Sequence, residues 1–257
     1  GLPSAIARAD TAPVLLKLDS VSKEFPGVKA LSNVSFELRA GEVHAVCGEN
    51  GAGKSTLMKI VSGVYQPDGG TIRYRDQPVR FASTLESEAA GIAIIHQELN
   101  LVPHLSVAEN IYLAREPKRG FFVDRRKLKK DAQRCLDRLG VKIDPSAQVL
   151  NLSVAQCQMV EIAKALSLNA SVLIMDEPTS SLTEQETQLL FKVIRELKAH
   201  GTGIVYISHR LDEMAEIVDR VTILRDGRYV WTKNFDAVTV DEIVAGMVGR
   251  SLDEKFP

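Results

Sequence analysis

Cysteine is scarce in this chain of 257 residues, and neither sign of charge predominates. The three cysteines, Cys47, Cys135 and Cys157, are scattered and form no CxxC pair. This argues against a disulfide framework and a structural zinc site, and favours a reducing, cytosolic setting. The formal net charge of −1 excludes a bulk attraction to nucleic acid. No apolar run approaches the ~18 to 20 residues that cross a bilayer, and we expect no signal peptide, so any membrane role should pass through a partner.

The composition that remains is that of an ordinary globular protein, 45% hydrophobic and 25% charged. The chain is long enough to bury a real core. We expect one domain over residues 14–250, with an inserted lobe. Residues 1–13 are rich in Ala and Pro without periodicity, which predicts a mobile leader. The polar residues 251–257 are typical of the start of a linker.

The stretch GENGAGKST at residues 48–56 is the strongest signal in the chain. It fits the phosphate-binding pattern GxxxxGKS at every fixed position, which are Gly48, Gly53, Lys54 and Ser55. An apolar strand is predicted before it at residues 43–47, and an amphipathic helix after it from Thr56 to Ser62. A chance Gly/Ser turn rarely has both neighbours, so the pattern in this context predicts a phosphate site.

Elementary chemistry assigns roles within this loop. Glycines let consecutive backbone N–H groups point at phosphate oxygens, and the following helix adds its positive N-terminal end. Lys54 brings a full charge near the β- and γ-phosphates, and Ser55 brings a hydroxyl for Mg²⁺. The residues expected to line the nucleotide are Gly48, Asn50, Gly51, Gly53, Lys54, Ser55 and Thr56.

Polar side chains follow three further predicted strands. The strands are residues 92–95, 171–175 and 203–208, and the residues after them are Gln97, the pair Asp176 and Glu177, and His209. Open α/β sheets bind ligands at the carboxyl ends of their strands. The sequence therefore predicts that these side chains meet the phosphate loop at one edge of a sheet.

Each of these polar residues has a second interpretation. Gln97 is a candidate to touch Mg²⁺ or the attacking water, and otherwise a solvated strand end. Asp176 can orient Mg²⁺ and Glu177 can accept a proton from water, although paired acids often only begin a loop. A lone histidine after a strand is usually a cap or a surface residue. With the phosphate loop upstream, we favour a metal-and-base pair and contact of His209 with the γ-phosphate.

Helical patterns replace strand patterns over residues 99–167. Ser106 and Glu109 form a capping box, and a third helix begins after Ser153. Between them a helix is predicted at residues 125–139, with Leu128, Ala132, Cys135 and Leu139 on its buried face and Arg126, Lys127, Lys129 and Lys130 on the other. Lipid headgroups and RNA phosphates are alternative partners for this basic face. We interpret it as a solvated face, because acids are interspersed and no aromatic residues are interleaved.

The remaining elements complete an α/β pattern. Strands are predicted at residues 14–19 and 34–38, hairpins at 71–81 and 221–231, and helices at 86–90, 184–200 and 240–248. The helix at 184–200 begins with a capping box of Thr183 and Glu186. Phe25 lies in a turn upstream of the phosphate loop. One aromatic in a loop is more often part of the core than a base-stacking platform, and both interpretations stay open.

Taken in order, residues 14–250 resemble the ATP-binding-cassette ATPases. The matching positions are Phe25 for the adenine-stacking aromatic, 48–56 for the Walker A loop, Gln97 for the Q-loop, LSVAQ at 152–156 for the signature motif, 173–177 for Walker B, 180–183 for the D-loop and His209 for the switch histidine. The resemblance implies a P-loop NTPase core with a mixed sheet, an N-terminal antiparallel β-subdomain and an inserted α-helical subdomain.

A narrower group, the bacterial monosaccharide importers, is similar at residues 96–101, 159–166 and 247–250. Those proteins carry two cassettes in one polypeptide, and this chain is similar to the N-terminal one. The resemblance implies that the chain hydrolyses ATP with Mg²⁺ on the cytoplasmic face of the cell membrane, and that hydrolysis drives sugar uptake through a transmembrane permease. It also implies a second cassette that faces this one and a sugar-binding protein that acts indirectly. The implied catalytic residues are Lys54, Gln97, Glu177 and His209, the implied metal ligands are Ser55, Gln97 and Asp176, and Ser153 would bind nucleotide in trans.

Departures from the family pattern keep two other functions open. Val154 and Ala155 replace the glycines of the usual LSGGQ signature, Thr183 replaces the D-loop aspartate, and Phe25 replaces a tyrosine. Side chains at 154 and 155 hinder close approach to a facing γ-phosphate, so we expect a weaker Ser153 contact. One alternative is a nucleotide-binding regulator without turnover. The other is a soluble cassette ATPase acting on nucleic acid or ribosomes, which would want a basic surface or a coiled-coil insertion.

Overall fold

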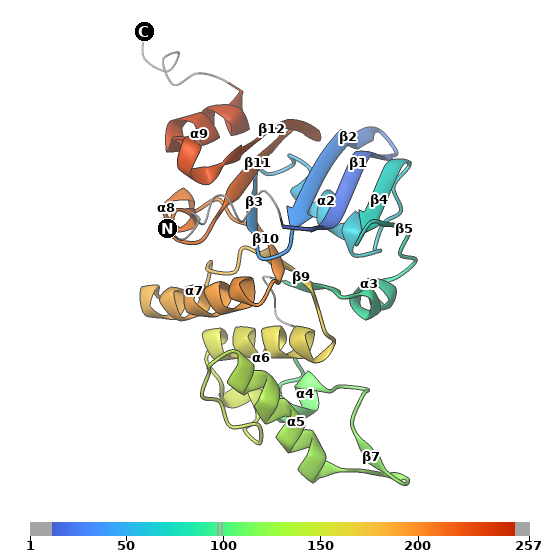
Figure 1. The fold of residues 1–257 in the computed structure, drawn as a ribbon, viewed down its shortest axis with the longest axis vertical. Helices are drawn as coiled ribbons and strands as arrows, with labels where there is room; N and C mark the ends of the chain where they lie inside the picture. The colour runs from blue at the N-terminus through green and yellow to red at the C-terminus, as the bar shows by residue number, and fades with distance from the viewer. Residues whose placement is uncertain (1–11, 97, 99, 250–257) are drawn as a thin grey trace.

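The computed structural model describes residues 12–96, 98 and 100–249, and arranges them as two sheets with helices around them (Figure 1). Its strands are β1 Val14–Phe25, β2 Val28–Arg39, β3 Val43–Cys47, β4 Gly69–Tyr74, β5 Gln77–Val79, β6 Ile92–Ile95, β7 Lys118–Arg119, β8 Phe122–Val123, β9 Val172–Asp176, β10 Gly203–Ile207, β11 Arg220–Arg225 and β12 Arg228–Asn234. Its helices are α2 Lys54–Val61, α3 Thr84–Ala90, α4 Val107–Ile111, α5 Arg125–Arg138, α6 Val154–Ser167, α7 Glu184–Ala199, α8 Leu211–Met214 and α9 Val240–Val248. Residues 1–11 of the expected leader at 1–13 lie outside the described residues, and so does the expected linker at 251–257.

The larger sheet has the strand order β12-β11-β3-β10-β9-β6. Its strands from β11 to β6 run parallel, and β12 adds an antiparallel edge. Every residue of β3 and β10 is buried, as expected for parallel strands covered on both faces. Because the strands are parallel, β3, β6, β9 and β10 all end at the same edge of the sheet.

The smaller sheet, β2-β1-β4-β5, is antiparallel. For β1 and β2 the sequence predicts strands at residues 14–19 and 34–38, and both predicted strands are too short. Pairing of β1 with β2 continues as far as Phe25 opposite Val28, so Phe25 ends a strand and does not lie in a loop. The register shifts along this pair, and Ser20 and Asn33 have positive φ. Such bulges break the alternation of apolar and polar residues from which strands are predicted.

A helical lobe made of α4, α5 and α6 lies below the larger sheet (Figure 1). Ser106 and Ser153 cap α4 and α6 through complete capping boxes. Leu128, Ala132, Cys135 and Leu139 are buried, which confirms the predicted inner face of α5. The small β7–β8 hairpin at the end of the lobe has no counterpart in the sequence prediction, because strands of two residues show no periodicity.

Two hydrophobic clusters meet at the larger sheet. Val43, Ala45 and Cys47 belong to the cluster shared with the helical lobe and α7, whereas Val46 belongs to the cluster shared with the smaller sheet and α2. Alternate residues of a strand point to opposite faces. The strand that precedes residues 48–56 is therefore anchored on both sides.

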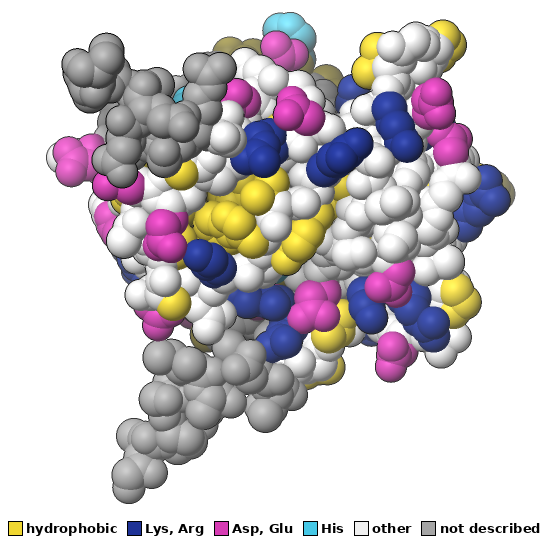
Figure 2. Space-filling view, turned by 90° about the horizontal axis from the view of Figure 1, so that it is seen from above, with side chains coloured by type: hydrophobic (Ala, Val, Ile, Leu, Met, Phe, Trp, Pro, Cys, Tyr) yellow, Lys and Arg dark blue, Asp and Glu magenta, His cyan; other side chains and the backbone are white. Residues whose placement is uncertain are grey.

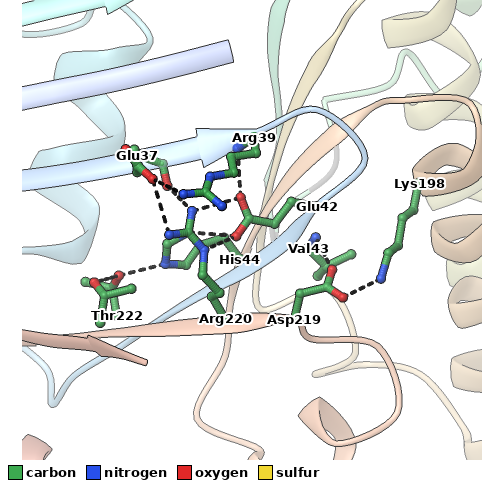
Figure 3. A network of polar contacts seen from close by, with 10 residues as sticks. Glu37, Arg39, Glu42, Val43, His44, Lys198, Asp219, Arg220 and Thr222 are labelled. Carbon is green, nitrogen blue, oxygen red and sulfur yellow. Dashed lines mark hydrogen bonds and ion pairs between the residues drawn. The ribbon is translucent and has the colours of Figure 1, made fainter. Parts of the chain in front are cut away.

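A buried polar network joins the two sheets (Figure 3). Arg220 of β11 donates to both carboxylate oxygens of Glu42, and its Nη1 lies 3.3 Å from Glu37 Oε1 on β2. Glu42 also accepts the backbone N–H of Arg39 at 2.7 Å. His44 Nε2 lies 2.7 Å from Thr222 Oγ1. These contacts hold β2, β3 and β11 in one arrangement.

The face seen in Figure 2 carries charges of both signs. Hydrophobic side chains gather in a central patch, and Lys and Arg alternate with Asp and Glu around it. In the part of the chain that the structure describes, no helix is long and apolar enough to cross a bilayer.

Candidate functional site: a phosphate loop at the strand ends

The loop at residues 48–56 joins β3 directly to α2. Gly53 is the N-cap of α2 with φ of 107°, a conformation that glycine adopts without strain. A Cβ at Gly48 would lie 2.6 Å from the carbonyl oxygen of Leu224, so a side chain is excluded there. The helix begins at Lys54, two residues earlier than predicted, which places Lys54 and Ser55 in its first turn. Asn50 and Gly51 are exposed, and Thr56 is half-buried within the helix.

Lys54 folds back over its own loop. Its ammonium donates to the carbonyl oxygen of Gly48, and to that of Glu49 at 3.1 Å. Burial lowers the pKa of Lys54, while the carboxylates of Glu177 and Asp176 act in the opposite direction. The amine therefore lies over the loop, where it can neutralise phosphate oxygens.

Glu177 is held in a constrained position just after β9. Its φ of 46° lies in the left-handed region, and its backbone N–H donates to the carbonyl of Ile207 at 2.8 Å. Such strain in a residue other than glycine is characteristic of functional sites. Glu177 Oε1 lies 2.8 Å from Nδ1 of His209, and Oε2 is buried with no hydrogen-bond partner among the described residues. A carboxylate only accepts hydrogen bonds, so this contact places a ring proton on Nδ1 of His209.

Ser55 and Asp176 adjoin a single cavity of about 290 Å³. The described residues contain no group of three or more His, Cys, Asp or Glu able to hold a metal ion unaided. A hydroxyl and a carboxylate suit Mg²⁺, which commonly takes one or two protein ligands and completes its shell with substrate phosphates and water. The residues present therefore fit Mg²⁺ bound together with a nucleotide. Gln97, the third predicted ligand, lies outside the described residues.

Phe25 packs against an aromatic residue that the sequence interpretation missed. Its ring and that of Tyr65 meet edge to face, with centroids 5.1 Å apart. The ammonium of Lys59, on α2, lies 5.5 Å from the centroid of Tyr65. Phe25 is thus connected through Tyr65 to the helix that follows the phosphate loop. Its proposed stacking on adenine stays a prediction.

Ser153 stands apart from the other predicted site residues. It is exposed at the N-terminus of α6, where it accepts the backbone N–H of Gln156 at 3.2 Å. Its own N–H donates to the Gln156 side chain at 3.0 Å. These contacts stay within the first turn of α6, so Ser153 faces outward from the chain.

Glu213 is a second residue that sequence reasoning missed. Its buried carboxylate accepts from Thr179 Oγ1 at 2.6 Å and pairs with Arg210 at 2.6 Å. Thr179 follows Glu177 by two residues, and Arg210 follows His209 directly. Glu213 therefore connects the two loops that carry the Glu177–His209 contact. Its only signal in the sequence is an acid shortly after His209.

The chain is similar to a known protein family and to several solved structures. The family model described as ABC transporter matches residues 31–180, which is more than half of the chain.

The chain belongs to the ABC transporter family.

Curated relatives refine the comparison. The chain is 78% identical over 252 residues to the putative ribose/galactose/methyl galactoside import ATP-binding protein 1 of Agrobacterium fabrum, covering 98% of this chain and 50% of that protein. It is 56% identical to the ribose import ATP-binding protein RbsA 1 of Rubrobacter xylanophilus, covering 95% of this chain and 48% of that protein. It is 51% identical to the galactose/methyl galactoside import ATP-binding protein MglA of Yersinia pestis, with the same shares covered. The chain spans about half the length of these relatives.

Solved structures share the fold. The ADP conformation of MJ1267, an ATP-binding cassette of an ABC transporter, matches with a TM-score of 0.79 at 24% identity, covering 94% of this chain and 97% of that one. The dimeric structure of MJ0796, a bacterial ABC transporter cassette, matches with a TM-score of 0.71 at 25% identity, covering 86% and 99%. The family and the α/β fold class expected from the motifs are both confirmed.

Proposed function

We propose that this chain is the ATP-binding and ATP-hydrolysing cassette of an importer for a monosaccharide. The observation that carries the proposal is the contact of His209 with Glu177 at 2.8 Å, at the edge of the sheet where β3 leads into the phosphate loop. The names of the relatives, which are import ATP-binding proteins for ribose or galactose, support the substrate class.

The residues divide the work of phosphoryl transfer among them. Backbone N–H groups of residues 48–56 and the ammonium of Lys54 bind the phosphates, and Phe25 stacks on the adenine. Ser55 and Asp176, with Gln97, would hold Mg²⁺, which when bound neutralises charge on the phosphate oxygens. Glu177 accepts a proton from a water that attacks the γ-phosphorus, the bond to the bridging oxygen breaks, and ADP and phosphate leave. His209 keeps the Glu177 carboxylate in position, and its contact with the γ-phosphate stays a prediction.

The partners follow from the family and from the outward position of Ser153. A second cassette facing this one would place its nucleotide opposite Ser153, and the dimeric solved cassette supports such an arrangement. In this proposal the cassette pair drives a transmembrane permease on the cytoplasmic face of a bacterial inner membrane. A sugar-binding protein outside the cell would act only through that permease.

The substitution Glu177→Gln tests the proposal. It removes the proton acceptor and keeps the size of the side chain, so MgATP should still bind while phosphate release falls at least tenfold, since general-base help is typically worth about 10²- to 10⁴-fold. Glu184→Gln, at an exposed position on α7, is the matched control and should change neither quantity. Near-normal turnover in Glu177→Gln would reject the assigned role.

A regulatory cassette without turnover is the second candidate. It is favoured by Val154 and Ala155, which put side chains at the start of α6 where the usual signature has glycines. In that case phosphate release by the wild-type chain, with its permease and second cassette present, would be no faster than that of Glu177→Gln. The face in Figure 2 carries charges of both signs and so gives the nucleic-acid alternative no basic surface there.

A further inference from the structure

Two aromatic side chains stand in solvent at the end of the helical lobe. Phe121 is 101% exposed and Phe122 is 80% exposed, in the β7–β8 hairpin that projects from the lobe (Figure 1). The hairpin pairs Lys118 with Val123 and Arg119 with Phe122. Adjacent exposed side chains of this size commonly mark a binding surface.

Positive charge surrounds this tip. Residues 118–130, which we call the 118–130 surface, contain one acid, Asp124, and seven exposed basic residues: Lys118, Arg119, Arg125, Arg126, Lys127, Lys129 and Lys130. The carboxylate of this one acid already has a hydrogen-bond partner, because Asp124 caps α5 by accepting the backbone N–H of Lys127 at 2.9 Å. Among the described residues, no carboxylate pairs with any of the seven basic side chains within 4 Å.

The needs of the fold do not account for this choice of residues. The first turn of α5 contains Arg125, Arg126 and Lys127 and no acid, although the positive end of a helix dipole disfavours cations there. The backbone N–H of Asp124 donates to the carbonyl of Pro117 at 2.7 Å, which holds the hairpin directly against this turn. The aromatic tip and the basic turn therefore form one continuous surface. The sequence predicts a solvated basic face on α5 because acids are interspersed and aromatics are not interleaved; Asp131 and Asp137 lie further along the helix, but the structure places two aromatics beside its first turn.

We propose that the 118–130 surface binds an anionic lipid bilayer directly, with Phe121 and Phe122 entering the headgroup region. Phe121 and Phe122 are exposed at the end of a hairpin that projects from the lobe, so both can enter a deformable lipid surface. Apolar insertion combined with several basic side chains is the pair of signals that gives stable peripheral binding. This contact goes beyond the proposed function, in which the cassette reaches the membrane through a permease.

Vesicle flotation of the 257-residue chain tests this proposal. The chain should float with vesicles of phosphatidylcholine and phosphatidylglycerol, and much less with phosphatidylcholine alone. Replacing both aromatics, Phe121→Ser with Phe122→Ser, should lower the partition coefficient at least tenfold. Arg126→Gln with Lys130→Gln should lower it and weaken its dependence on salt, since surface charges are screened by ions. Val28→Ser, at a site 59% exposed on the smaller sheet, is the matched control and should bind like the wild type.

Three outcomes would overturn the proposal. These are no preference for anionic vesicles, equal binding by the double-serine variant, or binding to a single-stranded RNA oligomer in place of vesicles. Phe121→Trp reports insertion directly. Vesicles with brominated acyl chains should quench the tryptophan fluorescence of this variant and should leave the emission of the wild type unchanged. The assay contains neither permease nor ATP, so a chain that does not float leaves the proposed ATPase function untouched. Glu177→Gln should float like the wild type.

Discussion

Individual residues at the strand ends are placed for chemistry at a cost to local stability. Glu177 adopts a left-handed backbone conformation, and within the part of the chain that the structure describes one of its buried carboxylate oxygens has no partner. Both features are unfavourable, at about 1 to 3 kcal/mol each. They persist because Ile207 and His209 bond to the residue directly, and Glu213 connects its loop to the loop of His209.

Substitution of His209 tests whether it positions Glu177. His209→Ala should lower phosphate release about tenfold at saturating ATP and leave nucleotide affinity unchanged, because the contact orients the base and not the substrate. His200→Ala is the control, since His200 is also an exposed histidine and its ring forms a hydrogen bond within its own helix, at the carbonyl of Glu196. Equal losses in the two variants would contradict the role of His209.

The phosphate loop gives a second test at this scale. Gly48→Ala should abolish ATP binding and destabilise the fold by about 1 to 3 kcal/mol, because the new methyl group would overlap the Leu224 carbonyl. Gly69→Ala is the matched change, since its methyl group would meet nothing closer than 3.8 Å, at the Ser22 side chain. Thermal unfolding and nucleotide titration measure both. A Gly48→Ala variant that binds ATP normally would show that the loop does not need close packing.

At the scale of elements, helix starts follow from local sequence. Ser106, Ser153, Thr183 and Thr239 each begin a helix with a complete capping box. The boxes at Ser106 and Thr183 are predicted from the spacing of a hydroxyl and an acid three residues apart, and both are confirmed. The prediction succeeds because every partner in such a box lies within one turn of the chain.

Thr183→Ala should destabilise the chain by about 1 kcal/mol through loss of the α7 cap. Thr183→Asp should keep most of that stability, because a carboxylate also accepts the Glu186 N–H and is favoured at a helix N-terminus. Urea unfolding of the two variants and the wild type measures the difference. If the aspartate costs as much as the alanine, the cap is not the source of the stability.

At the scale of the whole molecule, the two sheets are joined by the network around His44 (Figure 3). Burial lowers the pKa of His44 from 6.5 to about 3, and the facing guanidinium of Arg220 acts in the same direction. The other charged groups that face it are Glu37 and Arg39 on β2 and Glu42 before β3. The ring is therefore neutral in the folded protein over most of the acid range.

This depressed pKa predicts an acid-labile fold. At pH values between the folded pKa of about 3 and the unfolded pKa of 6.5, His44 is protonated in the unfolded chain and neutral in the folded protein. The contribution of His44 to folding stability is therefore complete above pH 6.5 and is lost as the pH falls from 6.5 toward 3. From pH ~7 to pH ~5 the loss from this group should be roughly 2 kcal/mol, measured by urea unfolding. His44→Gln, which cannot titrate, should show a shallower dependence on pH over the same range. Parallel curves for the two proteins would contradict this account.

The sequence by itself determined the parts of this protein that depend on neighbours along the chain. These are the phosphate loop between β3 and α2, the polar residues after β9 and β10, and the capped helices, because their geometry is set by short-range sterics and hydrogen bonds. Only the tertiary structure decided the rest. The long pairing of β1 with β2, the contact of Phe25 with Tyr65, the Glu177–His209 pair and the exposure of Phe121 each depend on register or packing between distant segments, which no local pattern encodes.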